Sequence, residues 1–195
     1  MKVCIVGAGA IGGFIGTRLA LAGRAQVSAI ARGATLAALR EHGWRLQQAI
    51  ALGAVTAQIT SFETSRGKIT AARAGNRTFR ADTFILATGR HIGGGLLAGR
   101  VTTEPLLGLG VFHDGVPAAG LGTRLHHLKY LDPAEEMRLG LMTDKRLHPL
   151  AEDGSAPYSN LYAAGALLGG YDYSGPCGFG VPILTGWLAG QYASK

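Results

Sequence analysis

Short apolar runs alternate along the chain with clusters of glycine and polar residues, in an order that predicts an α/β fold. The first run, Met1–Val6, is continuous enough to be a buried strand. Apolar positions then recur at helical spacing from about Ala10, which predicts a helix with one inward face. That inward face consists of Ile11, Phe14, Ile15, Leu19 and Ala20. A second strand is expected over 26–31 and a second helix over 35–42, ended by Gly43.

The next part of the chain changes from a helical to an alternating pattern. Residues 45–52 predict a further helix that ends at Gly53. From Ala54 onward apolar residues occupy alternate positions, which predicts a strand. These alternating positions are Val55, Ala57 and Ile59, followed by Phe62.

Turn signals at 65–67 and 75–76 frame a return strand over 68–73, so this segment is expected to form a β-meander. A meander of this kind is typical of flavoprotein nucleotide domains, where it crosses over the main sheet. Residues 83–87 predict a buried strand, 160–164 the last strand and 181–193 the last helix. The segment 113–150 gives no clear pattern.

The glycine motif between the first strand and the first helix is the strongest chemical signal. Gly7, Gly9 and Gly12 form a GxGxxG run, with Ala10 and Ile11 between the last two glycines. Gly7 allows a tight turn, Gly9 lets a pyrophosphate approach the backbone, and Gly12 lets helix and strand pack closely. The helix N-terminus offers free N–H groups to phosphates. The motif predicts a Rossmann-like FAD/NAD(P)-binding domain with a β-meander crossover, as a single domain over 1–195; the alternative is a glycine-tolerant turn without a ligand.

Composition agrees with a globular nucleotide-binding protein. The chain has 47% hydrophobic and 16% charged residues, 31 glycines, and a formal net charge of +7. A basic balance favours anionic partners such as a phosphorylated cofactor or substrate. No Lys/Arg run is interleaved with aromatic residues, so nucleic acid is not an expected partner. No apolar run reaches the length of a membrane helix, and the two cysteines have no CxxC spacing. We therefore expect a cytoplasmic protein that would reach a membrane only through partners.

Three further segments are candidate cofactor contacts. Arg32 and Gly33 follow the second strand, where arginine suits a 2′-phosphate or stacks on a flavin adenine, or is simply solvated. One strand ends at Ala87, Thr88 and Gly89, at the sheet edge where cofactors bind, and the last strand ends at Gly165. The alternative for both segments is an ordinary strand-to-loop turn. A final glycine run precedes the last helix, whose N-terminus would stabilise negative charge on a reduced flavin. That run and the helix start comprise Gly178, Phe179, Gly180 and Val181.

No residue is assigned a catalytic role, and no metal site is expected. The histidines show no metal-ligand spacing, and His91 is expected to be either a solvated loop residue or one that faces a flavin ring or a substrate. Asp144 and Arg146 either position a substrate or pair within a loop. Cys4 is expected to be a small core residue.

The first part of the chain resembles a ketopantoate reductase. The run 1–16, the Ile30–Gly33 segment and the run 36–40 carry the resemblance. In that family the arginine after the second strand holds the 2′-phosphate of NADP, which implies that role for Arg32. The family's catalytic Lys and its helical C-terminal domain have no recognisable counterparts here.

From about residue 45 onward, the chain resembles the C-terminal half of the B subunit of the anaerobic glycerol-3-phosphate dehydrogenase, and more loosely the fumarate-reductase-like flavoproteins. The matching runs are 84–89, 93–97, 104–109, 142–144, 160–172 and 177–180, with the closing helix. A long middle region of the full-length protein of that family is missing.

These resemblances imply a flavin-dependent oxidoreductase or flavin-binding dehydrogenase subunit acting on a small-molecule substrate, with FAD, or FMN, as cofactor and other dehydrogenase subunits as partners. FAD is preferred because the opening turn is built for a pyrophosphate. Two alternatives stay open. One is an NADP-binding reductase of the ketopantoate type, and the other is a cofactor-binding accessory module without turnover.

Overall fold

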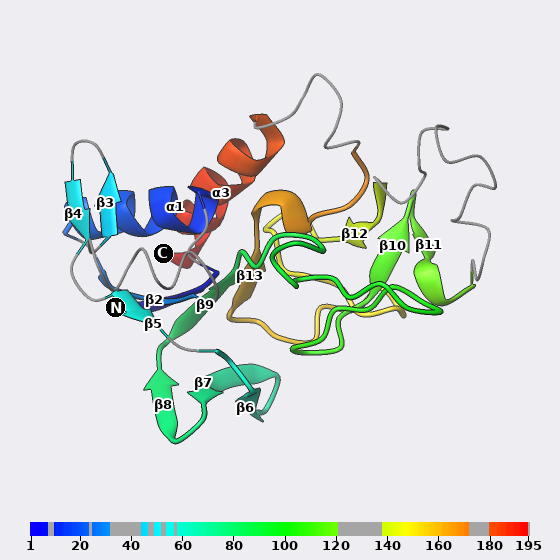
Figure 1. Ribbon diagram of the computed structural model, residues 1–195, viewed down its shortest axis with the longest axis horizontal. Helices are drawn as coiled ribbons and strands as arrows, with labels where there is room; N and C mark the ends of the chain where they lie inside the picture. The colour runs from blue at the N-terminus through cyan, green and yellow to red at the C-terminus, as the bar shows by residue number, and fades with distance from the viewer. Residues whose placement is uncertain are drawn as a thin grey trace.

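A parallel β-sheet forms the centre of the structure, a computed structural model of the chain (Figure 1). In the described residues its strands are ordered β13-β9-β1-β2-β5. Their bounds are β1 Lys2–Val6, β2 Gln26–Ala31, β5 Ala54–Thr56, β9 Thr83–Leu86 and β13 Leu161–Ala163. The structure describes residues 1–7, 10–23, 25–31, 44–46, 49–51, 54–56, 58–120, 138–171 and 180–194.

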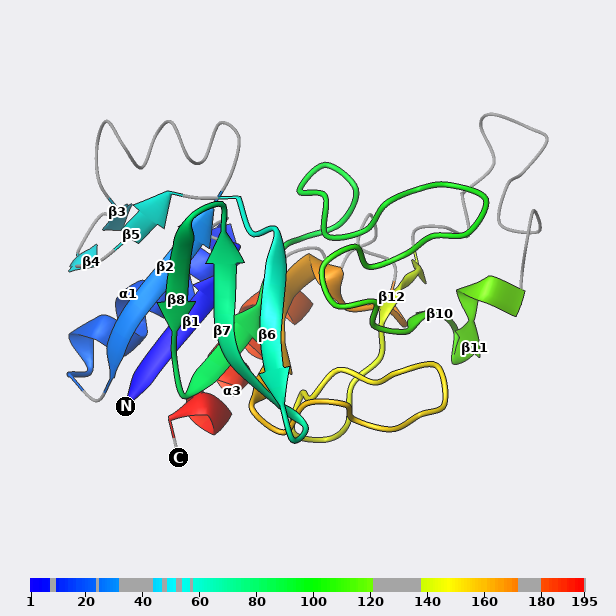
Figure 2. The same ribbon diagram turned by 90° about the horizontal axis from the view of Figure 1, so that it is seen from below.

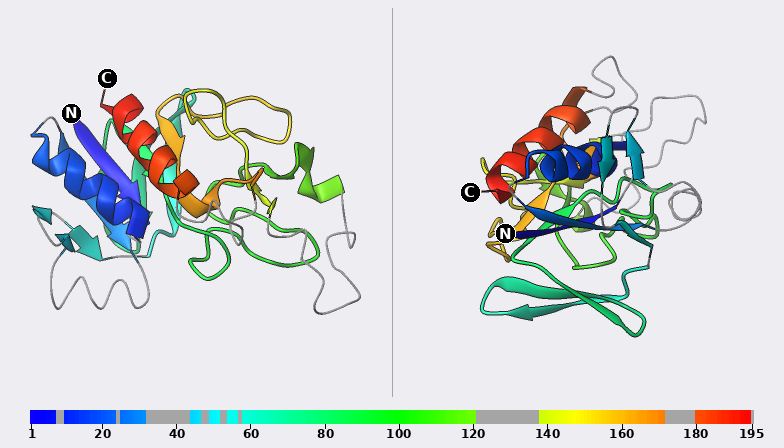
Figure 3. Two further views of the ribbon diagram at one scale, coloured as in Figure 1. Left: turned by 90° about the horizontal axis from the view of Figure 1, so that it is seen from above. Right: turned by 90° about the vertical axis from the view of Figure 1, so that its left-hand side faces the viewer.

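Helices cover one face of this sheet and a meander covers the other (Figure 3). Helices α1 (Ala10–Leu21) and α3 (Gly180–Ala193) pack together, and Val3 and Ile5 of β1 face them. Cys4 and Val6 face the meander, which consists of β6 (Ser61–Ser65), β7 (Lys68–Ala74) and β8 (Arg77–Arg80). Successive side chains of a strand point to opposite faces, so a strand buried on both faces reads as one continuous apolar run. The Rossmann-like fold with a meander crossover is therefore confirmed.

The turns and the last elements match their predictions closely. Arg66–Gly67 joins β6 to β7 and Gly75–Asn76 joins β7 to β8, as expected. Strand β9, strand β13 and helix α3 lie within one or two residues of the predicted ranges. In α1, Ile15 is buried and Leu19 and Ala20 pack against the same core, while the side chains of Ile11 and Phe14 lie outside the described residues.

The helix expected over 45–52 is wrong. The chain forms a hairpin there, with β3 (Trp44–Leu46) paired antiparallel to β4 (Ala49–Ala51). The hairpin packs against α1. Apolar residues four apart fit one helix face as well as a short hairpin, and contact with a neighbouring element decides between them.

The strand expected from Ala54 through Phe62 is also wrong in its extent. It is two strands, β5 in the parallel sheet and β6 in the meander. Between them Ile59 remains buried, and the Thr60 N–H donates to the Arg73 carbonyl at 2.8 Å. Ile59 is thus buried between exposed Gln58 and Thr60, so this one apolar position outside the strands still fits the alternating pattern that the sequence shows.

A smaller antiparallel group lies beyond the parallel sheet (Figure 1). Strands β11 (Val116–Pro117), β10 (Val111–His113) and β12 (Gly140–Leu141) are ordered β11-β10-β12. Short 3₁₀ turns, η1 (Ala118–Gly120) and η4 (Gly165–Leu167), complete the described elements. The helix predicted over 35–42 lies outside the described residues.

Candidate functional site

The opening glycine turn is shaped by backbone contacts that exclude a side chain. Gly7 has φ +104°, and its N–H donates to the Ile30 carbonyl at 2.8 Å. A Cβ at Gly7 would collide with the Ala87 carbonyl, and one at Gly12 with the Gly7 carbonyl. Both glycines therefore have the turn and packing roles expected of them. Gly9 lies outside the described residues, and Ala10 and Ile11 begin α1.

Three neighbouring strands end together at this edge. The Ala87 N–H donates to the Val6 carbonyl at 2.8 Å, and the Ala164 N–H donates to the Leu86 carbonyl at 3.0 Å. The turns after β1, β9 and β13 therefore follow one another along the carboxyl edge of the sheet. This edge is where open α/β sheets bind their ligands.

The turn after β9 holds open backbone and a buried hydroxyl. Gly89 has φ +74°, and within the described residues nothing lies within 4 Å of a Cβ built on it. The glycines at 93 and 95 fold back so closely on residues 88–89 that a Cβ on either would collide with their backbone. Thr88 Oγ1 is buried there without a hydrogen-bond partner in the described part of the chain. A ligand that approaches Gly89 would thus meet half-buried backbone with no side chain of the described residues in the way.

Arg90 is a buried cation next to this turn, and sequence reasoning missed it. It is only 7% exposed, its Nη2 donates to the Leu168 carbonyl at 3.1 Å, and its guanidinium lies 5.9 Å from the centre of the Tyr171 ring. A guanidinium stays charged when buried and must be held by such contacts. The sequence feature that could have indicated this residue is its position directly after the predicted Thr88–Gly89 turn.

The start of α3 is tied to the end of β13 by one side chain. The Gly165 N–H donates to Thr185 Oγ1 at 3.1 Å, and the same hydroxyl donates to the Val181 carbonyl at 2.8 Å. Gly180 begins the helix and is exposed, with open space around it among the described residues. The first turn of α3 therefore lies close to the edge where β13 ends. Gly178, Phe179, Arg32 and Gly33 lie outside the described residues.

The remaining polar candidates have local roles in the loops. Asp144 Oδ1 accepts the N–H groups of Arg146 and His148, each at 2.8 Å, so this carboxylate fixes its own loop. His148 stacks on Tyr162, with ring centres 4.5 Å apart, and burial raises the pKa of the Tyr162 phenol. His91 is half-buried, and its Nδ1 has no hydrogen-bond partner in the described structure.

Glu104 explains one of the sequence runs that resemble the dehydrogenase family. Its side chain is 2% exposed and accepts backbone N–H groups from Leu106 at 2.9 Å, Leu107 at 2.8 Å and Leu109 at 3.4 Å. The carboxylate thus organises the loop that follows it. Sequence reasoning gave this residue no role.

Cys4 is a core residue, as predicted. It is fully buried in β1, and burial raises the pKa of its thiol to about 11. Among the described residues, no three His, Cys, Asp or Glu side chains are grouped so that they could bind a metal ion. Within the same residues, no helix combines the length and apolar character needed to cross a membrane.

Comparison with known proteins gives two sets of relatives. A family described as ketopantoate reductase PanE/ApbA matches residues 3–88. A 2-dehydropantoate 2-reductase of Mesorhizobium japonicum is 54% identical over 46 residues, which cover 24% of this chain and 14% of that protein.

The second set carries the name of a dehydrogenase subunit. A probable anaerobic glycerol-3-phosphate dehydrogenase B subunit of Halobacterium salinarum is 36% identical over 117 residues, 59% of this chain and 26% of the relative. The corresponding B subunit of Yersinia pseudotuberculosis is 33% identical over 124 residues, 62% of this chain and 28% of the relative. The chain thus spans only about a quarter of the length of these relatives.

Two solved structures share the fold over nearly the whole chain. The GidA-related protein from Thermus thermophilus has a TM-score of 0.52 at 16% identity, covering 97% of this chain and 96% of that one. An oxidoreductase from Agrobacterium tumefaciens has a TM-score of 0.51 at 13% identity, covering 99% and 97%. The protein is therefore a Rossmann-like α/β chain that is similar to the glycerol-3-phosphate dehydrogenase B subunit over about six tenths of its length and to ketopantoate reductases in its N-terminal part.

Proposed function

We propose that this protein is a flavin-binding oxidoreductase unit similar to the B subunit of the anaerobic glycerol-3-phosphate dehydrogenase. The observation that carries the proposal is the grouping of the Gly7 turn, the Ala87–Gly89 turn and the Gly165 turn along one sheet edge. The start of α3 adjoins the last of these turns through Thr185. The resemblance to the B subunit supports a dehydrogenase over other nucleotide-binding proteins.

The residues at this edge fit a dinucleotide such as FAD. Gly7 and Gly12 place no side chain where the end of β1 meets α1, and a pyrophosphate bound at the N-terminus of that helix would accept its N–H groups. Gly89 and Gly180 both leave open space beside their backbone within the described residues. The buried Thr88 hydroxyl and the Arg90 cation add a donor and a positive charge near the same turn.

In this proposal each segment of the chain has a distinct task. A bound flavin supplies the hydride chemistry, and the protein supplies orientation and electrostatics. The turn formed by Gly7, Gly9, Ala10, Ile11 and Gly12 holds the pyrophosphate. The backbone of Ala87–Gly89 and Gly165 lies against the cofactor. The amides of Gly178–Val181 at the start of α3 stabilise negative charge on the reduced ring.

The absorption spectrum of the purified protein tests cofactor binding directly. A yellow protein that releases FAD on denaturation supports the proposal, and turnover of glycerol 3-phosphate with an artificial acceptor supports a dehydrogenase. A yellow protein without turnover favours a cofactor-binding accessory module. A colourless protein that takes up neither FAD nor FMN contradicts the proposal.

Gly180→Pro tests the role of α3. Proline is tolerated in the first turn of a helix, so the main loss is one N–H group. We expect the flavin midpoint potential to fall, or flavin affinity to drop by about tenfold, the loss of one hydrogen bond to a charged group. Gly180→Ala is the matched control, because it keeps the N–H and its Cβ has open space. An unchanged potential with full flavin occupancy in Gly180→Pro would remove α3 from the site.

A second candidate is an NADP-binding reductase of the ketopantoate type. The match of residues 3–88 to that family favours it, as does the position of Arg32 directly after β2. Titration of the colourless protein with NADPH measures this candidate. Tight binding that is lost in Arg32→Ala would establish it.

The resemblance to a dehydrogenase subunit also suggests partners. We propose that the protein works with other dehydrogenase subunits, as the name of its relatives implies for them. A cytoplasmic location, with any membrane contact made through those partners, belongs to the same proposal.

A further inference from the structure

The β-meander carries a large share of the positive charge of the protein. Residues 61–80 contain five cationic residues and one acidic residue, a formal net charge of +4, against +7 for the whole chain. The cations are Arg66, Lys68, Arg73, Arg77 and Arg80, and the acid is Glu63. The meander forms the layer on the far side of the sheet from the helices (Figure 2).

A bulge in β7 brings two of these cations to the same side. Lys68 and Arg73 are five residues apart, so an unbroken strand would place them on opposite faces. The register shifts at Glu63/Thr64, which leaves Thr70 unpaired in β7, and both Ile69 and Ala72 join the core. Lys68 and Arg73 are therefore both exposed on the solvent side.

Arg80 completes this solvent side. Glu63 and Arg80 flank Ala71 in register, and the Glu63 carboxylate pairs with Arg73 through a 2.7 Å hydrogen bond to Nε and with Arg80 at 3.6 Å. The two arginine side chains remain 52% and 69% exposed. We call Lys68, Arg73 and Arg80 the basic face. Exposed ion pairs are weak, so both arginines are available to a stronger anionic partner.

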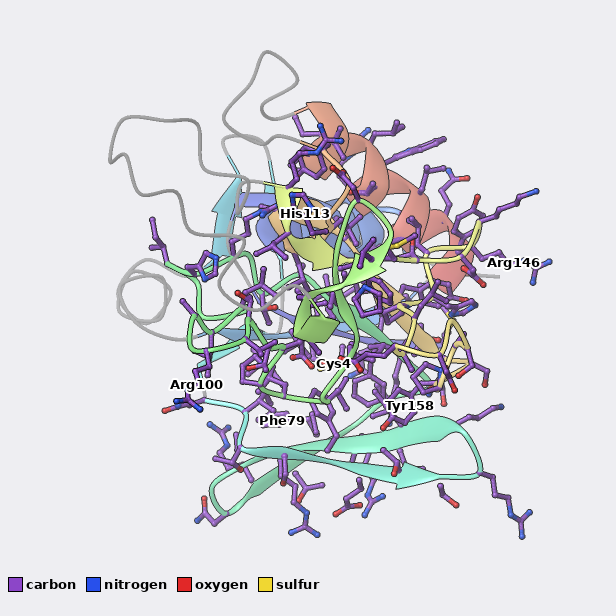
Figure 4. The ribbon with its side chains drawn as sticks, turned by 90° about the vertical axis from the view of Figure 1, so that its right-hand side faces the viewer. Cys4, Phe79, Arg100, His113, Arg146 and Tyr158 are labelled. Carbon is purple, nitrogen blue, oxygen red and sulfur yellow. The ribbon has the colours of Figure 1, made fainter. Side chains whose placement is uncertain are left out.

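The basic face is held on a rigid support. Asn160 donates to the Ile69 and Asp82 carbonyls and accepts the Ile69 N–H, and Ser159 donates to the Gly67 carbonyl at the hairpin tip. Phe79 lies on the core side of the meander (Figure 4). The backbone that carries these cations is therefore already ordered before a partner binds, which favours a specific contact.

We infer that the basic face is a docking surface for an acidic patch on a partner protein. The three cations of the face are complementary to the negative charge of such a patch. The choice of a protein as the partner rests on the subunit-type function proposed above. Both Phe62 and Phe79 pack inward, so the face offers no aromatic platform for nucleobases. None of the large apolar side chains exposed in the described residues belongs to the meander, so it has nothing to insert into a lipid surface.

Binding of labelled poly-L-glutamate to the purified protein tests the inference. The triple variant Lys68→Gln/Arg73→Gln/Arg80→Gln should weaken binding by about tenfold at low ionic strength, and salt should have the same effect on the wild type. The matched control is Arg18→Gln/Arg100→Gln/Lys145→Gln, which removes three exposed cations elsewhere. This control should change the affinity by less than about twofold. Glu63→Gln should tighten binding, because it releases Arg73 and Arg80.

Other results would overturn the inference. Equal losses in the two triple variants would show that only total charge matters, and an absence of poly-L-glutamate binding would remove the site. The triple variant is also tested with short single-stranded DNA and with vesicles containing phosphatidylglycerol. A larger loss of affinity for either of these than for poly-L-glutamate would assign the basic face to that ligand. Flavin content is recorded in parallel. A colourless protein that shows the expected pattern contradicts the proposed function alone, and a yellow protein without it contradicts the docking surface alone.

Discussion

Asn160 joins the meander to the parallel sheet, and its removal gives the sharpest stability test. Its amide nitrogen donates to the carbonyls of Ile69 at 2.8 Å and Asp82 at 2.9 Å, and its amide oxygen accepts the Ile69 N–H at 2.8 Å. Each such bond contributes about 1 kcal/mol net, so Asn160→Ala should lower the free energy of unfolding by about 2–4 kcal/mol. Asn160→Asp should also destabilise, because a carboxylate would face two carbonyl oxygens.

Urea unfolding followed by circular dichroism measures this change, and amide exchange at Ile69 localises it. The exposed turn residue Asn76 provides the matched control, and Asn76→Ala should stay within about 0.5 kcal/mol of the wild type. If Asn160→Ala were equally neutral, with unchanged protection of the Ile69 amide, the meander would not depend on this side chain and the reasoning would fail.

Two further predictions concern the core. Gly12→Ala should destabilise the protein by about 1–3 kcal/mol, because its Cβ would collide with the Gly7 carbonyl. Gly190→Ala should be neutral or stabilising by up to about 1 kcal/mol, since its Cβ meets Ile15 at an ordinary 3.4 Å. Thermal unfolding compares the two variants, and a stability change of the same sign in both would contradict the packing argument. The Cys4 pKa is raised to about 11, so the folded state holds this proton more tightly than the unfolded state, and stability should decline as pH rises from about 9 towards 11. In urea titrations over that pH range, the free energy of unfolding of Cys4→Ala should decline less than that of the wild type. Identical pH profiles for the two proteins would refute the role of the Cys4 thiol.

Much of the fold was readable from local pattern. Continuous apolar runs predicted β1 and β9, because both faces of these strands are buried, and Gly67 and Gly75 marked the hairpin turns through their positive φ values. The segment 44–59 was misread because its decisive contacts are distant. The β3-β4 hairpin packs on α1, and β5 pairs with β2. A single sequence carries no direct signal of those neighbours.

The candidate site shows the same division. The geometry of Gly7 and Gly12 followed from a motif whose spacing fixes the turn. The burial of Arg90 could not be read in this way, because its partners Leu168 and Tyr171 lie about eighty positions further along the chain. Thr185 was missed for a similar reason, since its link to Gly165 depends on where α3 lies relative to β13.

The strand order also bears on how the molecule forms during synthesis. β1 is the middle strand of the sheet, and one of its two neighbours, β9, begins 81 residues after it, while β13 comes later still. The side chains of Val3 and Ile5 therefore become fully buried only after most of the chain, including α3, has been synthesised. Such distant pairings predict that the parallel sheet folds slowly.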